Sequence, residues 1–172
     1  MSITLHMVAS LDGFIAKKDD DYSWMDVSWS AYDKGMEMTA DILETIDCYI
    51  IGSRTYELAL KLGWPYAEKR TIVATKRKLT AAGPNVEFYS GDLVDLAKSL
   101  AQKNVWLVGG PTLYREFFPL NLVDKICLTV VPILLGSGVA LFDGKEQKLR
   151  LTDMSAFKNG MIDLWYEVVR NP

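Results

Sequence analysis

Three short apolar runs in the middle of the chain constrain its fold more than any other feature. They lie within Asp47–Ile51, Arg70–Ala74 and Val105–Val108. Apolar residues follow one another in these runs without polar alternation, as in strands that are buried on both faces of a parallel sheet. Helix-like segments alternate with the strand-like ones. The sequence therefore predicts an α/β fold with helices on both faces of its sheet.

The remaining elements define the order of the predicted fold. Further strands are expected over Ile3–Ala9, Val86–Tyr89, Lys125–Val131 and Met161–Val169. Helices are expected over Ser30–Thr45, Arg54–Leu62, Leu93–Ala101 and Thr112–Phe118, and Asp92 has the position of an N-cap. This order predicts a mostly parallel mixed sheet with antiparallel C-terminal strands. The length of 172 residues fits a single domain over residues 1–172.

Composition excludes several classes of function. The net charge is −3 and the basic residues are scattered, so a nucleic-acid partner is not expected. No apolar run or signal-peptide pattern indicates a membrane, and we expect a cytoplasmic protein. The single histidine and the lack of a C-x-x-C pair argue against a zinc site. Cys48 and Cys127 lie in apolar runs, which predicts buried free thiols.

The strand-to-helix turns are the candidate ligand sites, because open α/β sheets bind ligands beyond the carboxyl ends of their strands. Gly52 is followed by Ser53, Arg54 and Thr55, which suits a phosphate at a helix N-terminus. Taken alone, that turn is better explained as an ordinary strand–helix turn with a serine cap.

Two more turns have the same character. Thr75, Lys76, Arg77 and Lys78 follow an apolar strand and offer cations to a phosphate, or simply form a solvated loop. In V-W-L-V-G-G-P-T-L-Y, paired glycines precede a helix that starts with proline. Each turn is weak alone, but three in one small sheet favour a dinucleotide cofactor.

Five motifs in this order carry a resemblance to a known family. They are V-A-S-L-D-G-F-I-A, I-I-G-S-R-T-Y-E, T-I-V-A-T-K-R, V-G-G-P-T-L-Y and L-T-V-V-P-I-L-L-G-S-G-V-A-L-F. Together they resemble the dihydrofolate-reductase-like superfamily, which includes the reductase domain of riboflavin biosynthesis. The resemblance spans nearly the whole chain. It implies a three-layer fold and NADPH as cofactor.

The resemblance also implies which residues bind the cofactor. The implied positions are Val8, Ile15, Gly52, Ser53, Arg54, Thr55, Thr75, Lys76, Arg77, Gly109, Gly110, Thr112, Leu113 and Tyr114. Val8 and Ile15 match positions near the nicotinamide. The Gly109–Gly110 peptide is expected to be cis, as is common in that family.

The sequence also offers candidate catalytic and substrate-binding residues. Folate reductases carry an acid where this chain has Met36; the adjacent Glu37 is a candidate, although it belongs to a regular acidic helix face with Asp33 and Asp41. Asp12, in a D-G turn, is the second catalytic candidate. His6 stands where riboflavin-pathway reductases typically have lysine. His6, Trp24 and Thr129 are candidates for substrate binding.

Three functional hypotheses remain open at this stage. The first is an NADPH-dependent reductase of a small pterin- or pyrimidine-like heterocycle. The second is the riboflavin-pathway 5-amino-6-(5-phosphoribosylamino)uracil reductase, and the third is an NADP-binding protein without catalytic activity. A homodimer is expected from the resemblance. The natural substrate and the proton donor are not identified by the sequence.

Overall fold

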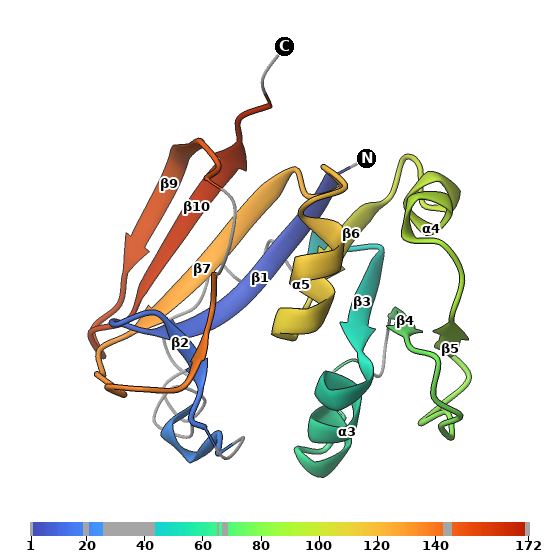
Figure 1. Ribbon diagram of the computed structural model, residues 1–172, viewed down its shortest axis with the longest axis horizontal. Coiled ribbons are helices and arrows are strands. Elements are labelled where there is room, and N and C mark those ends of the chain that lie inside the picture. Colours follow the sequence, from blue (N-terminus) through green and yellow to red (C-terminus); the bar gives the residue numbers. More distant parts are fainter. Residues whose placement is uncertain are drawn as a thin grey trace. The chain divides into compact units, whose positions relative to one another are not determined.

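A computed structural model describes residues 2–18, 21–25, 44–64, 66, 69–142 and 146–170. Eight strands form a mixed sheet in the order β5-β4-β3-β6-β1-β7-β10-β9, and β2 and β8 form a separate two-stranded ribbon (Figure 1). The strands are β1 (Ser2–Ser10), β2 (Phe14–Ala16), β3 (Cys48–Gly52), β4 (Arg70–Ala74), β5 (Val86–Tyr89), β6 (Asn104–Leu107), β7 (Lys125–Val131), β8 (Val139–Ala140), β9 (Leu149–Ala156) and β10 (Ile162–Val168). The helices are η1 (Ser23–Met25), α3 (Ser53–Lys61), α4 (Leu93–Ser99) and α5 (Pro111–Phe117). The α/β class and the mostly parallel mixed sheet predicted from the sequence are confirmed.

The chain divides into two compact units. The first comprises Met1–Leu5 and Thr45–Asp124, and the second comprises His6–Glu44 and Lys125–Pro172. The boundary falls inside β1, so this strand contributes its first half to one unit and its second half to the other. Each unit is described by itself below.

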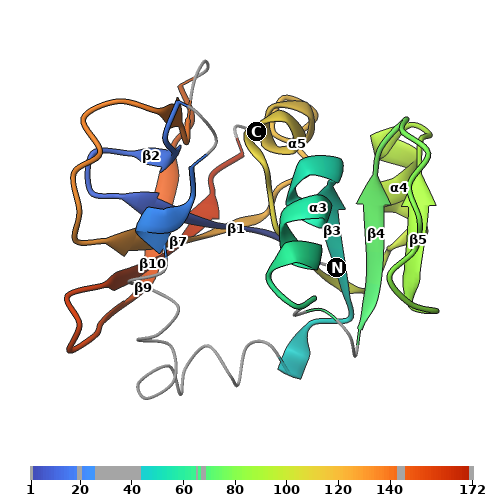
Figure 2. The same cartoon turned by 90° about the horizontal axis from the view of Figure 1, so that it is seen from below.

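The first unit contains the parallel part of the sheet. β4 pairs in parallel with β5 and with β3, β3 pairs with β6, and β6 pairs with Ser2–Leu5 of β1. Ile50, Ile51 and Val73 are fully buried, as the uninterrupted apolar runs predict. Figure 2 shows α3 beside β3 and β4, and Tyr56 and Ala59 are the buried residues of this helix.

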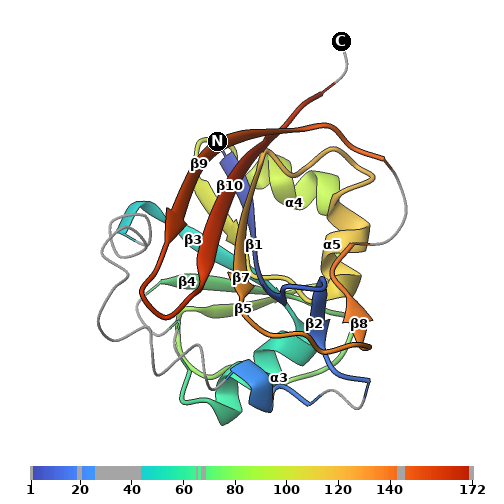
Figure 3. The ribbon, with the colours of Figure 1, turned by 90° about the vertical axis from the view of Figure 1, so that its left-hand side faces the viewer.

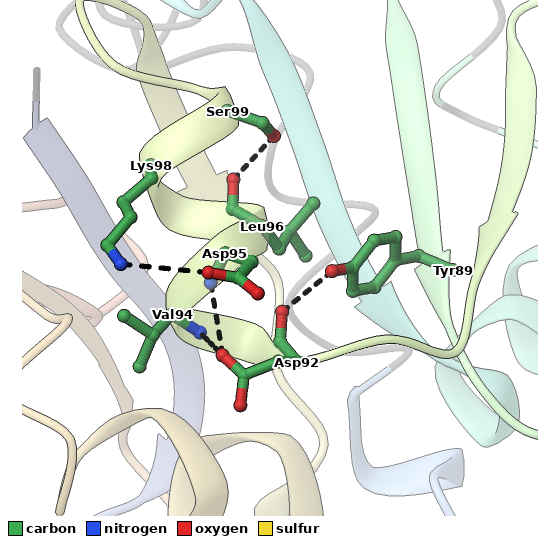
Figure 4. Close-up of polar contacts among 7 residues, drawn as sticks. All are labelled: Tyr89, Asp92, Val94, Asp95, Leu96, Lys98 and Ser99. Carbon is green, nitrogen blue, oxygen red and sulfur yellow. Dashed lines mark hydrogen bonds and ion pairs between the residues drawn. The ribbon is translucent and has the colours of Figure 1, made fainter.

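Helix α4 begins as the sequence predicts. The Asp92 carboxylate accepts hydrogen bonds from the backbone N–H groups of Val94 and Asp95, at 2.8 and 3.1 Å (Figure 4). These bonds satisfy two of the donors that a helix N-terminus leaves without an intrahelical partner. The N-cap role predicted for Asp92 is confirmed.

The second unit contains the antiparallel part of the sheet. β10 pairs antiparallel with β7 on one side and with β9 on the other, while β2 pairs with β8 (Figure 3). Trp24 of η1 packs with Val131 and Met161 in a buried apolar cluster. Both cysteines are buried and free, as expected, and burial raises the pKa of Cys48 to about 11.

Most predicted elements lie within one or two residues of the observed ones, but three strands were missed. β9 was not predicted because its residues are almost all exposed and do not alternate in burial. β2 and β8 have three and two residues, too few for a recognisable period. The helix predicted over Ser30–Thr45 lies outside the described residues apart from Glu44 and Thr45, which are helical.

Candidate functional site

The ends of three parallel strands form the first candidate site. β3, β4 and β6 are neighbours and run in the same direction, so their carboxyl ends lie at one edge of the first unit. Gly52 ends β3, Ala74 ends β4, and Val108 to Gly110 follow β6. The three turns that the sequence analysis singled out therefore start from adjacent strands.

Hydrogen bonds join two of these turns directly. The backbone N–H of Gly52 donates to the carbonyl oxygen of Gly109 at 3.4 Å. The hydroxyl of Thr55, in the first turn of α3, donates to the same carbonyl at 3.1 Å. These bonds hold the turn after β3 against the turn after β6, although Thr55 and Gly109 are 54 positions apart in the sequence.

The prediction of a cis peptide bond between Gly109 and Gly110 is wrong, because this bond is trans. Both glycines instead adopt positive φ, 60° and 79°. These two consecutive residues turn the chain from β6 into α5 without a cis bond. A positive φ favours glycine, because glycine has no Cβ. A Cβ at position 110 would lie 3.3 Å from the Thr55 hydroxyl oxygen, so the lack of a side chain also keeps the contact between the turns close.

Gly52 is the N-cap of α3 and Gly110 is the N-cap of α5. Within the part of the chain that the structure describes, neither N-cap makes a side-chain capping hydrogen bond. The serine cap considered for the first turn is therefore wrong, since Ser53 is already inside α3. Helix α4 differs from these two helices, because the Asp92 side chain caps it (Figure 4). An uncapped N-terminus on the nine-residue helix α3 favours a negatively charged ligand.

An ion pair occupies the basic turn after β4. Arg77 donates to both carboxylate oxygens of Glu57, on α3, at 2.9 and 2.6 Å. The guanidinium holds the pKa of Glu57 below its ordinary value. The Thr75 hydroxyl oxygen accepts from the backbone N–H of Arg77, which fixes the turn. Arg54 and Lys76 are exposed.

The other cofactor candidates differ in exposure. Thr112 is exposed, whereas Leu113 and Tyr114 are buried core residues of α5, and the Tyr114 ring packs against Phe118. In the second unit, Ile15 is buried on β2 and Val8 packs against the cluster around Trp24.

A chain of polar side chains forms the second candidate site, within the second unit. His6 Nε2 lies 3.4 Å from the hydroxyl oxygen of Thr129. That hydroxyl donates to Asp163 Oδ1 at 2.6 Å, and both Thr129 and Asp163 are buried. Burial lowers the pKa of His6 to about 4 and raises the pKa of Asp163.

Asp163 was missed by the sequence analysis, although a signal was present. It is a lone carboxylate inside the strand segment M-I-D-L-W, and a buried charge needs a hydrogen-bonding partner. Thr129, directly opposite on β7, is that partner. His6 and Thr129, both predicted to bind substrate, are brought together by the fold.

Asp12 has structural contacts within the second unit. Its carboxylate accepts from the Ser10 hydroxyl at 2.6 Å and from the backbone N–H groups of Gly136 and Leu135 at 2.7 and 3.1 Å. These bonds tie the turn after β1 to the segment before β8, and they lower the pKa of Asp12.

The remaining candidates lie apart from these two groups. Trp24 is 4% exposed, and its indole N–H has no hydrogen-bond partner among the residues that the structure describes. Glu37 and Met36 lie outside the described residues. Within the described ranges, no cluster of His, Cys, Asp and Glu could hold a metal ion, and no helix is long and apolar enough to cross a membrane.

Comparison with known proteins places this geometry in a family. The model of the RibD C-terminal domain matches residues 64–162. The uncharacterized protein YwjB of Bacillus subtilis (strain 168) is 33% identical over 160 residues, which cover 89% of this chain and 90% of that protein. The riboflavin biosynthesis protein RibD of Buchnera aphidicola is 29% identical over 98 residues, which cover 55% of this chain and 23% of that protein.

Solved structures share the fold. A protein of Shewanella sp. PV-4, named for riboflavin biosynthesis, superposes with a TM-score of 0.84 at 24% identity, and the match covers 99% of this chain and 100% of that one. The deaminase/5-amino-6-(5-phosphoribosylamino)uracil reductase of Thermotoga maritima has a TM-score of 0.69 at 17% identity, and the match covers 98% of this chain and 56% of that longer chain. The chain belongs to the RibD C-terminal domain family.

Proposed function

We propose that the chain is an NADPH-dependent reductase that acts on a small pterin- or pyrimidine-like heterocycle. The observation that carries this proposal is the joined pair of turns at Gly52–Thr55 and Gly109–Gly110. A pyrophosphate site at a strand end uses glycines, which let the ligand approach the backbone, and the N–H groups of an uncapped helix. The bond from Thr55 to the Gly109 carbonyl oxygen holds the two turns together.

The chain's own residues fit the cofactor group by group. Among the described residues no side chain caps the first turn of α3, so its N–H groups can serve as donors to a phosphate. Because Gly110 has no Cβ, its backbone can lie close to the Thr55 hydroxyl oxygen, which a Cβ would approach to 3.3 Å. Arg54 and Lys76 are exposed cations on the flanking turns. NADPH, when bound, would supply a hydride for the reduction.

Arg77 is the candidate for selecting NADPH over NADH. A guanidinium can bind the 2′-phosphate of NADPH through paired hydrogen bonds. Here its partner is the Glu57 carboxylate, and this pair is partly exposed, at 53% for Arg77 and 40% for Glu57. Exposed ion pairs contribute little stability, so a phosphate dianion can replace the carboxylate.

A riboflavin-pathway reaction is the second candidate. Family membership supports reduction of 5-amino-6-(5-phosphoribosylamino)uracil, the substrate in the name of the Thermotoga protein. The chain has His6 where lysine is typical of those reductases, so the pyrimidine and the pterin both belong in the substrate test. A homodimer, which rests on the resemblance, and a cytoplasmic location, which rests on the sequence pattern, complete the proposal.

The test has a binding stage and a turnover stage. Thermal unfolding is measured with NADPH and with NADH, and NADPH oxidation is then followed with dihydrofolate and with 5-amino-6-(5-phosphoribosylamino)uracil. We expect greater stabilisation by NADPH than by NADH, and turnover of one substrate. Stabilisation by NADPH without turnover would favour an NADP-binding protein that lacks catalytic activity. No stabilisation by either nucleotide would overturn the proposal.

A further inference from the structure

The antiparallel strands of the second unit share one apolar face. Residues directly opposite one another in an antiparallel pair lie on the same face, and successive residues of a strand alternate between faces. Leu164 of β10 lies opposite Leu128 on β7 and Met154 on β9 (Figure 3). The register assigns to this face, which we call the outer face, Ile126, Leu128 and Val130 of β7, Ile162, Leu164, Tyr166 and Val168 of β10, and Leu149, Leu151, Met154 and Ala156 of β9.

A β-bulge brings two side chains of β9 onto the outer face together. The register between β10 and β9 shifts between Trp165 and Tyr166, and Thr152 is the residue of β9 that it passes over. In a regular strand Leu151 and Met154, three positions apart, would lie on opposite faces. The bulge therefore keeps the outer face apolar along the whole of β9.

The outer face is accessible, whereas the opposite face of the same strands is buried. On β7, Cys127, Thr129 and Val131 are buried, while Leu128 and Val130 between them are half-buried. The most exposed residues of the outer face are Met154 at 60%, Leu151 at 50%, Leu149 at 38% and Ile162 at 37%. An antiparallel sheet that packs one face on a core normally has polar side chains on the other. Here the accessible face is apolar, which indicates that it is covered in the working protein.

The charged side chains of these three strands all lie on the opposite face. The register places Glu167 between Lys125 and Arg150, and Arg150 forms an ion pair with Glu167 there. Asp153 and Asp163 lie on that face too, opposite Trp165 and Thr129. The outer face thus has no charge with which to bind a nucleic acid or an anionic membrane. Interfaces between identical subunits have such a composition, because their cores are apolar and depleted of charge.

The size of the outer face fits a small interface. Strands about 4.8 Å apart, with a rise of about 3.4 Å per residue, give three strands of this length a projected area of about 340 Å². Contiguous apolar patches of this size mark interaction sites on proteins. Two copies that cover this face on each other bury more than about 680 Å², which suits a reversible dimer and not an obligate one.

We propose that a second copy of the chain packs on the outer face, so that the two antiparallel sheets lie face to face about a two-fold axis. Two-fold symmetry brings the same face of both copies together, and an uncharged face can meet itself without contacts between like charges. Side chains of sheets packed in this way interdigitate, and Leu151 and Met154 protrude most. The proposal rests on the homodimer in the proposed function, for which it names the surface, and not on the cofactor.

Sedimentation of the full chain over a series of concentrations tests this proposal. The variants Leu151→Lys and Met154→Lys each place a cation on the outer face, at positions exposed enough for the monomer to keep its fold. Leu120→Lys is the matched control, since Leu120 lies in the turn after α5 and is 45% exposed, against 50% for Leu151. Melting temperatures of all variants, measured at low protein concentration, check that each monomer is folded.

We expect a wild-type dimer that dissociates on dilution. Leu151→Lys and Met154→Lys should each raise its dissociation constant by about 30-fold or more, the size of a hot-spot effect at an interface, because two-fold symmetry adds the charge to both copies. Leu120→Lys should leave the constant unchanged. A wild type that stays monomeric would overturn the proposal, and another part of the chain or a different protein would then cover the face. So would a dimer that both outer-face variants leave intact, or one that all three variants disrupt alike.

The outcome can be separated from the test of the proposed reductase. NADPH binding is followed on the same proteins by thermal unfolding, and the turns at Gly52–Thr55 and Gly109–Gly110 belong to the first unit, not to the outer face. A dimer that NADPH does not stabilise would contradict the cofactor proposal alone. A monomer that binds NADPH would contradict the outer-face proposal and leave the cofactor proposal standing.

Discussion

The Thr55 hydroxyl donates a hydrogen bond to the carbonyl oxygen of Gly109, at 3.1 Å. This one bond joins the first turn of α3 to the glycine turn after β6. Each turn alone has an ordinary structural explanation, as a strand–helix connection. They are held together at the ends of adjacent parallel strands, and this is the edge at which we propose that the pyrophosphate of the cofactor binds.

Removing the Thr55 hydroxyl should loosen this edge. Thr55→Val keeps the volume of the side chain but loses the bond to Gly109, which costs about 1 kcal/mol in the free energy of unfolding. It should also weaken NADPH binding, because the two turns are no longer held in register. Thr55→Ser keeps a hydroxyl and should behave like the wild type. Equal NADPH affinity in all three proteins, measured by calorimetry, would contradict the role given to this bond.

Gly110 should tolerate no side chain. Its φ of 79° is unfavourable for other residues, and a Cβ would lie 3.3 Å from the Thr55 hydroxyl oxygen. Gly110→Ala should cost about 1–2 kcal/mol of unfolding free energy and also reduce NADPH binding. Gly63→Ala is the matched control, since Gly63 has a φ of 94° in open space. The control should lose stability but keep NADPH binding; loss of binding in both variants would point to general unfolding instead.

Glu57 should restrain Arg77 from binding a 2′-phosphate. Glu57→Gln removes a negative charge and frees the guanidinium, so NADPH affinity should rise by about two- to fivefold, the scale of an exposed ion pair. NADH affinity should not change, because NADH lacks the 2′-phosphate. Glu87→Gln breaks the equally exposed Arg70–Glu87 pair on β4 and β5 and serves as control. The prediction is wrong if both Glu variants shift NADPH and NADH affinities alike.

Asp12 should stabilise the second unit in a pH-dependent way. The Ser10 hydroxyl and the N–H groups of Gly136 and Leu135 lower its pKa in the folded state below the ordinary 3.8. The stabilisation is therefore present above about pH 4 and is lost as the pH falls through the folded pKa. Asp12→Asn should lower the melting temperature at neutral pH and flatten its dependence on pH below about 4.

The exposed Asp153 on β9 provides the control for Asp12. Asp153→Asn should leave the melting temperature and its pH profile close to those of the wild type. If Asp12→Asn has wild-type stability but impaired reduction, the aspartate acts on the substrate, as the sequence analysis proposed, and its structural role is minor.

The sequence predicted the parallel half of the fold well because burial leaves a simple pattern there. The parallel strands β4 and β5 have the predicted bounds, and β1, β3 and β6 differ from theirs by one residue at each end. The exposed strand β9 lacks this signal and was missed. β9 is positioned by its antiparallel pairing with β10, and this pairing cannot be recognised from the side chains of β9 alone.

The candidate site was predictable in its residues but not in its contacts. The glycine turns were recognised from their positions after apolar strands, whereas the Thr55–Gly109 bond spans 54 positions and the Asp12–Gly136 bond spans 124. The Gly109–Gly110 peptide is trans, whereas the family resemblance predicted a cis bond. Two positive φ angles, not a cis bond, form this turn. Long-range contacts of this kind depend on the assembled sheet and cannot be read from sequence spacing.

The most direct test of the cofactor site is an NADPH titration followed through backbone amide signals in ¹H–¹⁵N spectra. The account predicts that the largest shifts occur at Gly52 to Thr55 and at Gly109 and Gly110, and that Arg77 responds to NADPH more than to NADH. Unchanged signals at these glycines under saturating NADPH, or shifts confined to the second unit, would contradict it.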